Sequence, residues 1–141
     1  MQKIEELIAA LEKAEGPDRD LDADILEAIG ECAHRETEYY CIEDGNDVDS
    51  GFTCKRCHKD TYGERVAAFT ASIDAAVALV ERVLPDAFWV MSRGRLRIEE
   101  PLYAAQILFG LDEILGEAEG NSLPIAICLA TLRAKLSQEK N

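Results

Sequence analysis

Four residues in the first half of the chain have the types and the spacing of zinc ligands. Cys54 and Cys57 form a Cys-x-x-Cys pair that places two sulfur atoms on one tight turn, and Cys32 and His34 form a Cys-x-His pair, with 19 residues between the two pairs. Structural zinc takes four sulfur or imidazole ligands in a tetrahedron, so the two pairs would complete its coordination sphere. A sphere closed by four protein ligands leaves no position for the water that a catalytic zinc activates. We therefore predict one structural zinc ion at these four residues.

Three further cysteine and histidine residues bear on this assignment. Cys41 lies between the two pairs and could replace Cys32 or His34 as a ligand. His58 is a weaker substitute, because it directly follows a predicted ligand and adjacent residues seldom point toward one metal; a surface position or a hydrogen bond to a ligand suits it better. Cys128 lies on the apolar stripe of a predicted helix, where a small buried hydrophobic residue is expected. The alternative to a metal site is a set of unligated thiols.

The length and composition predict a single domain, residues 1–141, with an acidic surface. The 141 residues are 48% apolar and 30% charged, which provides enough apolar side chain for one core. The 28 acidic residues against 15 basic ones give a net charge of -13, and residues 1–63 hold 17 of the acids and 7 of the bases. Such a field repels phosphate backbones and anionic lipids and attracts basic surfaces. We expect a protein partner with a basic surface, and neither direct nucleic-acid binding nor membrane binding; alternatively, the charge only provides solubility.

The N-terminus does not have the pattern of a signal peptide. Its sequence, MQKIEELIAALEKAEG, carries charges within the apolar stretch and lacks a small-residue cleavage site. No run approaches the roughly 18 apolar residues that a membrane span needs. The expected location is the cytoplasm, where a reducing environment keeps clustered cysteines available for metal.

The N-terminal part of the chain is predicted to form two helices and a hairpin. Apolar residues at i, i+3, i+4 and i+7 predict an amphipathic helix that starts near Ile4 and ends at Gly16-Pro17. A second helix is expected from Asp20, a good N-cap, to Gly30. Two strands are predicted over residues 37–42 and 48–53, joined by turn residues. We assign residues 1–30 to N-terminal helices and residues 31–63 to a zinc-ribbon-like insertion.

Residues 64–141 are predicted to form a helix-sheet-helix core. A short strand over residues 66–69 precedes a helix with Ser72 as its N-cap and Pro85 after its end. Four further segments have the composition of strands: residues 87–92, 95–98, 102–109 and 114–118. The first two would join at Ser92-Arg93-Gly94. The segment 102–109 is the weakest, because its Leu, Ala and Gln residues favour a helix.

The last predicted helix opens near Gly120-Asn121-Ser122 and carries an apolar stripe from Ile125 to Leu136, with a fraying tail after it. The predicted fold class is therefore α+β. It consists of an antiparallel sheet of three or four strands packed with helices, and a zinc-ribbon-like Cys/His insertion near the N-terminal half.

Arg93, Arg95 and Arg97 form a basic patch in the predicted hairpin. On a strand all three guanidinium groups would project to one face. Carboxylates of this acidic chain could neutralise them on a solvated sheet face. Alternatively, they could bind an anion or a nucleotide, because the guanidinium fork suits phosphate.

Sequence motifs of catalysis are absent. The chain has no HExxH, no glycine-rich phosphate loop and no GxSxG, and it has only two histidines, one of which the zinc would occupy. We therefore predict that the protein is not an enzyme.

Three stretches of the sequence resemble small bacteriophage and prophage proteins, including those grouped as a phage helix-sheet-helix (ABA) sandwich. They are residues 7–30, with the core Gly-Pro-Asp-Arg-Asp-Leu-Asp, residues 69–80 (FTASIDAAVALV) and residues 124–134 (PIAICLATLRA), and they cover under half of the chain. The resemblance implies a fold and a location in a bacterial host cell, and it brings no catalytic residues. The Cys/His segment departs from it, since these proteins have a shorter aromatic strand segment there.

These features favour a non-enzymatic, acidic, phage-type accessory protein that binds a protein partner, for example to inhibit a bacterial defence complex. Two hypotheses from other classes stay open. The first is a small-ligand or nucleotide-binding protein that sequesters its ligand with the Arg93–Arg97 hairpin. The second is a zinc-containing nucleic-acid-binding module, supported by Lys55, Arg56 and Lys59 around the Cys-x-x-Cys pair.

Overall fold

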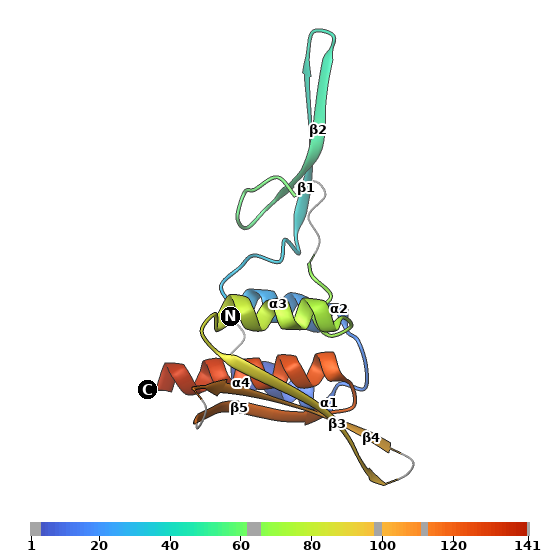
Figure 1. Ribbon diagram of the computed structural model, residues 1–141. Coiled ribbons are helices and arrows are strands. Elements are labelled where there is room, and N and C mark those ends of the chain that lie inside the picture. The colour runs from blue at the N-terminus through green and yellow to red at the C-terminus, as the bar shows by residue number, and fades with distance from the viewer. Residues whose placement is uncertain (1–3, 62–65, 98–99, 111–112, 141) are drawn as a thin grey trace.

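The described chain consists of a body and a projecting hairpin (Figure 1). The computed structural model describes residues 4–61, 66–97, 100–110 and 113–140, and within the strands it leaves the side chains of residues 93–102 outside the description. The elements are, in order, α1 (Ile4–Lys13), α2 (Arg19–Ala28), β1 (Thr37–Asp44), β2 (Asp47–Cys54), α3 (Ile73–Val83), β3 (Phe88–Arg97), β4 (Glu100–Phe109), β5 (Glu113–Gly120) and α4 (Leu123–Lys140). These helices and two antiparallel sheets, β1-β2 and β3-β4-β5, confirm the predicted α+β class.

The start of α2 differs from the prediction by two residues. The N-cap is Asp18, not Asp20: its carboxylate accepts hydrogen bonds from the backbone N–H groups of Asp20 and Leu21, at 2.8 and 3.2 Å. Asp18 takes this role because its backbone is extended (φ -144°) and because its own N–H is held by the Thr70 hydroxyl at 2.9 Å. At the other end Gly30 has φ +92°, the left-handed conformation that was predicted to close the helix.

Three predictions for the second half of the chain are wrong. Residues 66–69 form no strand, and β3 runs without a break through Ser92-Arg93-Gly94. The reason for the second difference is pairing: Ser92, Arg93 and Gly94 face consecutive residues of β4, which satisfies their backbone groups in the sheet. The C-terminal tail was predicted to fray after residue 136, whereas α4 continues to Lys140. By contrast, the weakest predicted strand is confirmed as β4, the central strand of the sheet.

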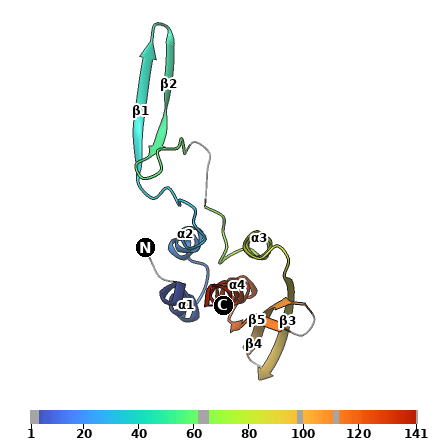
Figure 2. The same cartoon turned by 90° about the vertical axis from the view of Figure 1, so that its left-hand side faces the viewer.

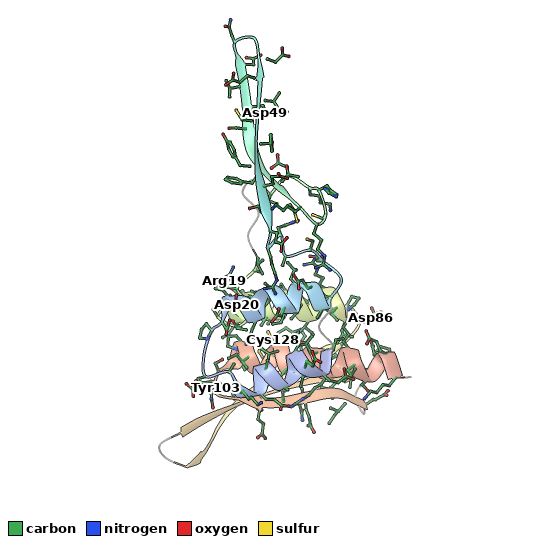
Figure 3. The ribbon with its side chains drawn as sticks, turned by 180° about the vertical axis from the view of Figure 1, so that it is seen from behind. Arg19, Asp20, Asp49, Asp86, Tyr103 and Cys128 are labelled. Atoms are coloured by element: carbon green, nitrogen blue, oxygen red, sulfur yellow. The ribbon has the colours of Figure 1, made fainter. Side chains whose placement is uncertain are left out.

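The helix α4 lies between the sheet and the other helices (Figure 2). It packs on β4 and β5 on one side and contacts α1 and α3 on the other. Its residues 124–132 are therefore buried without a break, and not only along the predicted stripe. Cys128 is fully buried there, its thiol 3.4 Å from the Phe69 carbonyl oxygen, as a small hydrophobic core residue was expected to be (Figure 3).

Small residues allow α4 to approach the sheet closely. Gly116 of β5 faces the backbone of α4 so directly that an added Cβ would lie 2.4 Å from the Ala130 carbonyl oxygen and 2.6 Å from the Ala134 nitrogen. The next glycine on this face, Gly120, has room for a Cβ at ordinary contact distances of 3.6 to 3.7 Å. The close approach thus depends on one position without a side chain.

A buried carboxylate connects α2 to the segment before α3. Asp22 is fully buried, and its Oδ1 accepts hydrogen bonds from the Thr70 N–H at 2.8 Å and the Thr70 hydroxyl at 2.7 Å. Its Oδ2 pairs with Arg19 at 2.8 Å. Because both oxygens have partners, the charge is compensated inside the core.

The hairpin β1–β2 projects away from the body in both views (Figures 1 and 2), and we call residues 37–54 the arm. Its strands pair in continuous antiparallel register, from Thr37 opposite Cys54 to Asp44 opposite Asp47. The turn between them places Gly45 at φ +64°, the conformation that a two-residue hairpin turn requires at its first central position. Most side chains of the arm are exposed.

Candidate metal centre

The register of the arm brings the two predicted ligand pairs together. Thr37 is opposite Cys54, so the segment just before β1 and the segment just after β2 leave the base of the arm side by side. Cys32 and His34 lie in the first of these segments, and Cys54 and Cys57 begin the second. The hairpin pairing therefore makes the two ligand pairs neighbours in space, although 19 residues separate them in the sequence.

Each pair lies on a tight backbone corner. After Cys54 the chain folds back, with the His58 N–H donating to the Cys54 carbonyl at 2.9 Å and the Cys54 N–H donating to the Lys59 carbonyl at 2.9 Å. The Lys55 N–H donates to the Glu36 carbonyl at 2.9 Å, which holds this corner against the other one. His34 and His58 both have left-handed backbones, with φ of 51° and 62°. Such values are uncommon outside glycine, and here they occur two residues after Cys32 and one residue after Cys57.

The four potential ligand atoms lie close enough together to share one metal ion. All of them lie within 4.8 Å of one another. The Sγ atoms of Cys32 and Cys54 are 3.6 Å apart, and the Cys57 Sγ is 3.3 Å from the His34 Nδ1. With zinc bonds of about 2.3 Å to sulfur and about 2.0 Å to nitrogen, the edges of a tetrahedron are roughly 3.8 Å between sulfurs and roughly 3.5 Å between sulfur and nitrogen. The group Cys32, His34, Cys54 and Cys57 can therefore hold a metal ion.

The electrostatics of the cluster favour a thiolate at Cys54. The Cys57 backbone N–H, which donates to the Cys54 sulfur, is the largest cause that lowers the pKa of Cys54 from 9.0 to about 6. Hydrogen bonds from the His34 side chain and from the Arg56 N–H act in the same direction, while burial opposes them. Backbone N–H donors stabilise a sulfur anion as they stabilise other anions. A thiolate is the form that binds metal.

Cys32 shows the opposite direction. The His34 backbone N–H lowers its pKa, but burial and the neighbouring thiols of Cys54 and Cys57 together raise it above 9.0. Bringing several sulfurs together disfavours placing a negative charge on all of them when no cation is present. A metal cation removes this conflict, because it compensates the charge of every thiolate at once.

Ion pairs connect the Cys32–His34 corner to the body. Arg35 donates to Glu27 at 2.8 Å and also pairs with Asp24, both on α2. Glu31 pairs with Arg82 of α3. Each exposed pair contributes on the order of 0 to 1 kcal/mol, so they orient the corner more than they stabilise the fold. These contacts could not be predicted from the sequence, because the partners lie on helices that only the tertiary structure places nearby.

The two alternative ligands lie outside the four-residue group. Cys41 is exposed on β1 opposite Ser50, farther along the arm than the base. His58 is exposed and follows Cys57 on the outside of the corner. Among the residues that the structure describes, the Cys/His group that can hold a metal consists of the four residues first predicted.

The predicted basic patch cannot be placed as a site. Arg93, Arg95 and Arg97 are on β3 and alternate along it, but their side chains lie outside the described residues. An anion or nucleotide site there stays a prediction. Lys55, Arg56 and Lys59 are exposed at the base of the arm, next to the metal cluster.

Comparison with known proteins adds no relative. No family model, no curated protein and no solved structure matches this chain. In the described part of the chain, none of the helices combines the length and the apolar character that crossing a membrane requires.

Proposed function

We propose that the protein binds one zinc ion through Cys32, His34, Cys54 and Cys57, and that this zinc anchors the arm for contact with a protein partner. The observation that carries the proposal is the convergence of the four ligand atoms within 4.8 Å at the base of a projecting hairpin. Three sulfurs and one imidazole are a ligand set of structural zinc and are unsuited to magnesium or calcium. All four positions of the tetrahedron are filled by the chain, which leaves none for catalysis.

The arm supplies the physical reason for a metal. A single two-stranded hairpin is marginally stable in water, because it buries little apolar surface. The strand residues of this arm are mostly exposed, whereas Cys54 at its base is fully buried. A zinc ion at the base would join both ends of the hairpin to the Cys32–His34 corner, with a binding free energy of about 10 to 16 kcal/mol as in zinc-finger peptides.

The role of the arm follows from its composition. Residues 37–54 contain five acidic residues and no basic one. Tyr39 and Phe52 are exposed on the same arm, and aromatic side chains are enriched in protein interfaces, whose rims are polar. From the exposed aromatic side chains and the acids we infer a binding protein rather than an enzyme. A phage origin and the inhibition of a bacterial defence complex stay predictions from the sequence.

Zinc content tests the metal site directly. We expect one zinc per chain in protein purified from metal-replete cells, measured by plasma mass spectrometry. Cys57→Ser should weaken zinc binding by more than about 100-fold in a chelator competition. Removing a residue that only hydrogen-bonds to a metal ligand already lowers metal affinity by about 10 to 100-fold, and the loss of a ligand itself should cost more. The matched control is Cys41→Ser, which changes a cysteine of the arm that lies outside the cluster and should keep full zinc.

Hydrogen exchange tests the structural role. Removal of zinc should speed amide exchange in residues 37–54 and leave α4 protected, because the core of the body is formed by other residues. The zinc site would be refuted if the wild-type protein contained no zinc, or if Cys57→Ser and Cys41→Ser bound zinc with equal affinity. Unchanged exchange in the arm after chelation would refute its structural role.

A further inference from the structure

The two faces of the arm have different side chains. Residues directly opposite each other in an antiparallel pair share a face, and successive residues alternate between faces. The register therefore places on one side Tyr39, Cys41, Glu43, Val48, Ser50 and Phe52, which we call the aromatic face. The other side, the acidic face, carries Glu38, Tyr40, Ile42, Asp44, Asp47, Asp49, Gly51 and Thr53. Figure 3 labels Asp49 on the outer part of the arm, away from the body.

The aromatic ring of the acidic face is used by the chain itself. Tyr40 covers Gly51 on the opposite strand so closely that a Cβ at Gly51 would lie 3.0 Å from the Tyr40 hydroxyl oxygen. The Tyr40 hydroxyl also donates to the Asp60 carboxylate at 3.1 Å, which connects the arm to the segment after the metal corner. This ring stabilises the hairpin and is half-buried.

The aromatic face has large apolar side chains that the arm does not cover. Tyr39, Val48 and Phe52 are 61%, 65% and 48% exposed. The rings of Tyr39 and Phe52 touch edge to face, with centroids 5.5 Å apart and planes at 62°. Their mutual contact favours this orientation of the two rings without burying them. Such pre-oriented aromatic side chains are the typical anchors of protein interfaces.

The charge of the arm selects the partner. Its five acids form no ion pair within the described part of the chain. They repel nucleic acid and anionic lipid, and they would equally repel the arm of a second copy. A protein surface with lysines and arginines would neutralise them. Glu43 lies on the aromatic face, and the other four acids lie on the opposite face. Because the ribbon is only two strands wide, with strands about 5 Å apart, long basic side chains on the rim of a groove that holds the aromatic face can extend past its edges to these acids.

We propose that the aromatic face docks into an apolar groove of a partner protein and that basic residues on the rim of this groove pair with the acids of the arm. This inference rests on the proposed function of the arm and specifies which face binds and what it binds. Phe52 and Tyr39 are the anchors, and the acids set the salt dependence and the rate of association.

Site-specific cross-linking tests the proposal. The photoreactive residue p-benzoylphenylalanine replaces Phe52 in one protein and Tyr39 in a second. In the control it replaces Phe88, on the outer face of the body sheet, which has the same exposed fraction as Tyr39, 61%. Zinc-loaded proteins are irradiated in lysate of the source cells, and the cross-linked partner and its attached peptide are identified by mass spectrometry. The partner is then purified, and its Kd is measured for wild type, Phe52→Ala and Phe88→Ala at low and high salt.

The expected result is cross-linking from positions 39 and 52 to a peptide with apolar and basic residues. Phe52→Ala should weaken binding at least about 30-fold, as loss of an interface anchor does, while Phe88→Ala should not. Zinc content checks the metal site of each variant, and circular dichroism checks its fold. Three outcomes would overturn the inference but not zinc-dependent partner binding. They are cross-linking from Phe88 alone, cross-linking to a second copy of this chain, and a Kd that is unchanged in Phe52→Ala. If no position cross-links to any protein, the partner-binding function itself fails as well.

Discussion

The substitution Gly116→Ala tests how closely α4 packs on the sheet. The added Cβ would lie 2.4 Å from the Ala130 carbonyl oxygen, whereas ordinary contacts begin near 3.4 Å. The helix must therefore retreat from β5 by about 1.0 Å, the difference between these two distances. Both nearest atoms belong to the backbone, at Ala130 and Ala134, so no side-chain rotation can relieve the overlap. Because α4 is the centre of the core, its displacement loosens packing on several sides.

The magnitude follows from two opposing effects. Overpacking a core costs about 1 to 3 kcal/mol, and the upper end applies where backbone atoms clash. Replacing glycine by alanine within a strand recovers about 0.5 to 1 kcal/mol of backbone entropy. We expect a net loss of about 2 kcal/mol in the free energy of unfolding for Gly116→Ala. For a chain of this size that lowers Tm by roughly 8 °C.

Gly120→Ala is the matched control on the same strand. Its Cβ would meet α4 and the preceding turn at 3.6 to 3.7 Å, so only the entropic gain should remain. Urea unfolding followed by circular dichroism gives both free energies under one set of conditions. Equal stabilities of the two variants would refute the reasoning, as would a structure of Gly116→Ala in which α4 has not moved.

Three further predictions concern the arm and the core. In the metal-free protein, folding lowers the pKa of Cys54 from 9.0 to about 6. Between these two pH values the unfolded chain binds more protons than the folded chain, so the stability of the metal-free arm should rise from pH 6 to pH 9. Amide exchange measures this rise, which should vanish in Cys54→Ser. Asp22→Ala leaves the buried Thr70 N–H without an acceptor, while the Thr70 hydroxyl keeps the Asp18 carbonyl oxygen at 3.2 Å. The free energy of unfolding in urea should fall by about 2 kcal/mol, whereas Asp20→Ala in the exposed first turn should cost less than about 1 kcal/mol. Gly51→Ala pushes against the Tyr40 ring at 3.0 to 3.2 Å and should speed exchange in the arm while the zinc content stays unchanged; slower exchange would contradict the close stacking of this ring.

Local rules of the sequence were enough to locate the helices and the hairpin, apart from the start of α2, where a contact with Thr70 holds the N-cap Asp18. The spacing of Leu7, Ile8 and Leu11 predicted α1, and Ser72 was identified as the cap of α3, where its hydroxyl accepts the Ala75 N–H. These features involve contacts within one or two turns of helix, so neighbouring residues alone decide them. The arm is equally local, because glycine at its turn and alternating side chains define a hairpin without help from the body.

Non-local pairing decided what the sequence left ambiguous. The segment 102–109 is rich in helix-forming residues, yet β4 forms because it is hydrogen-bonded on both sides, to β3 and to β5. Ala105 and Ile107 then point into the core beneath α4. In a central strand, burial and pairing outweigh intrinsic propensity.

The types and spacing of Cys32, His34, Cys54 and Cys57 were sufficient to predict which residues could share a metal. Whether Cys41 would replace one of them could not be read from the sequence, because it depends on the register of the arm. Pairing Thr37 with Cys54 places Cys41 outward along the hairpin and the four other residues at its base. The projection of the arm away from the body, which leaves its aromatic face open, is likewise a property of the tertiary structure (Figure 1). Ligand chemistry is carried by individual residues, whereas their convergence depends on hydrogen bonds between segments far apart in the chain.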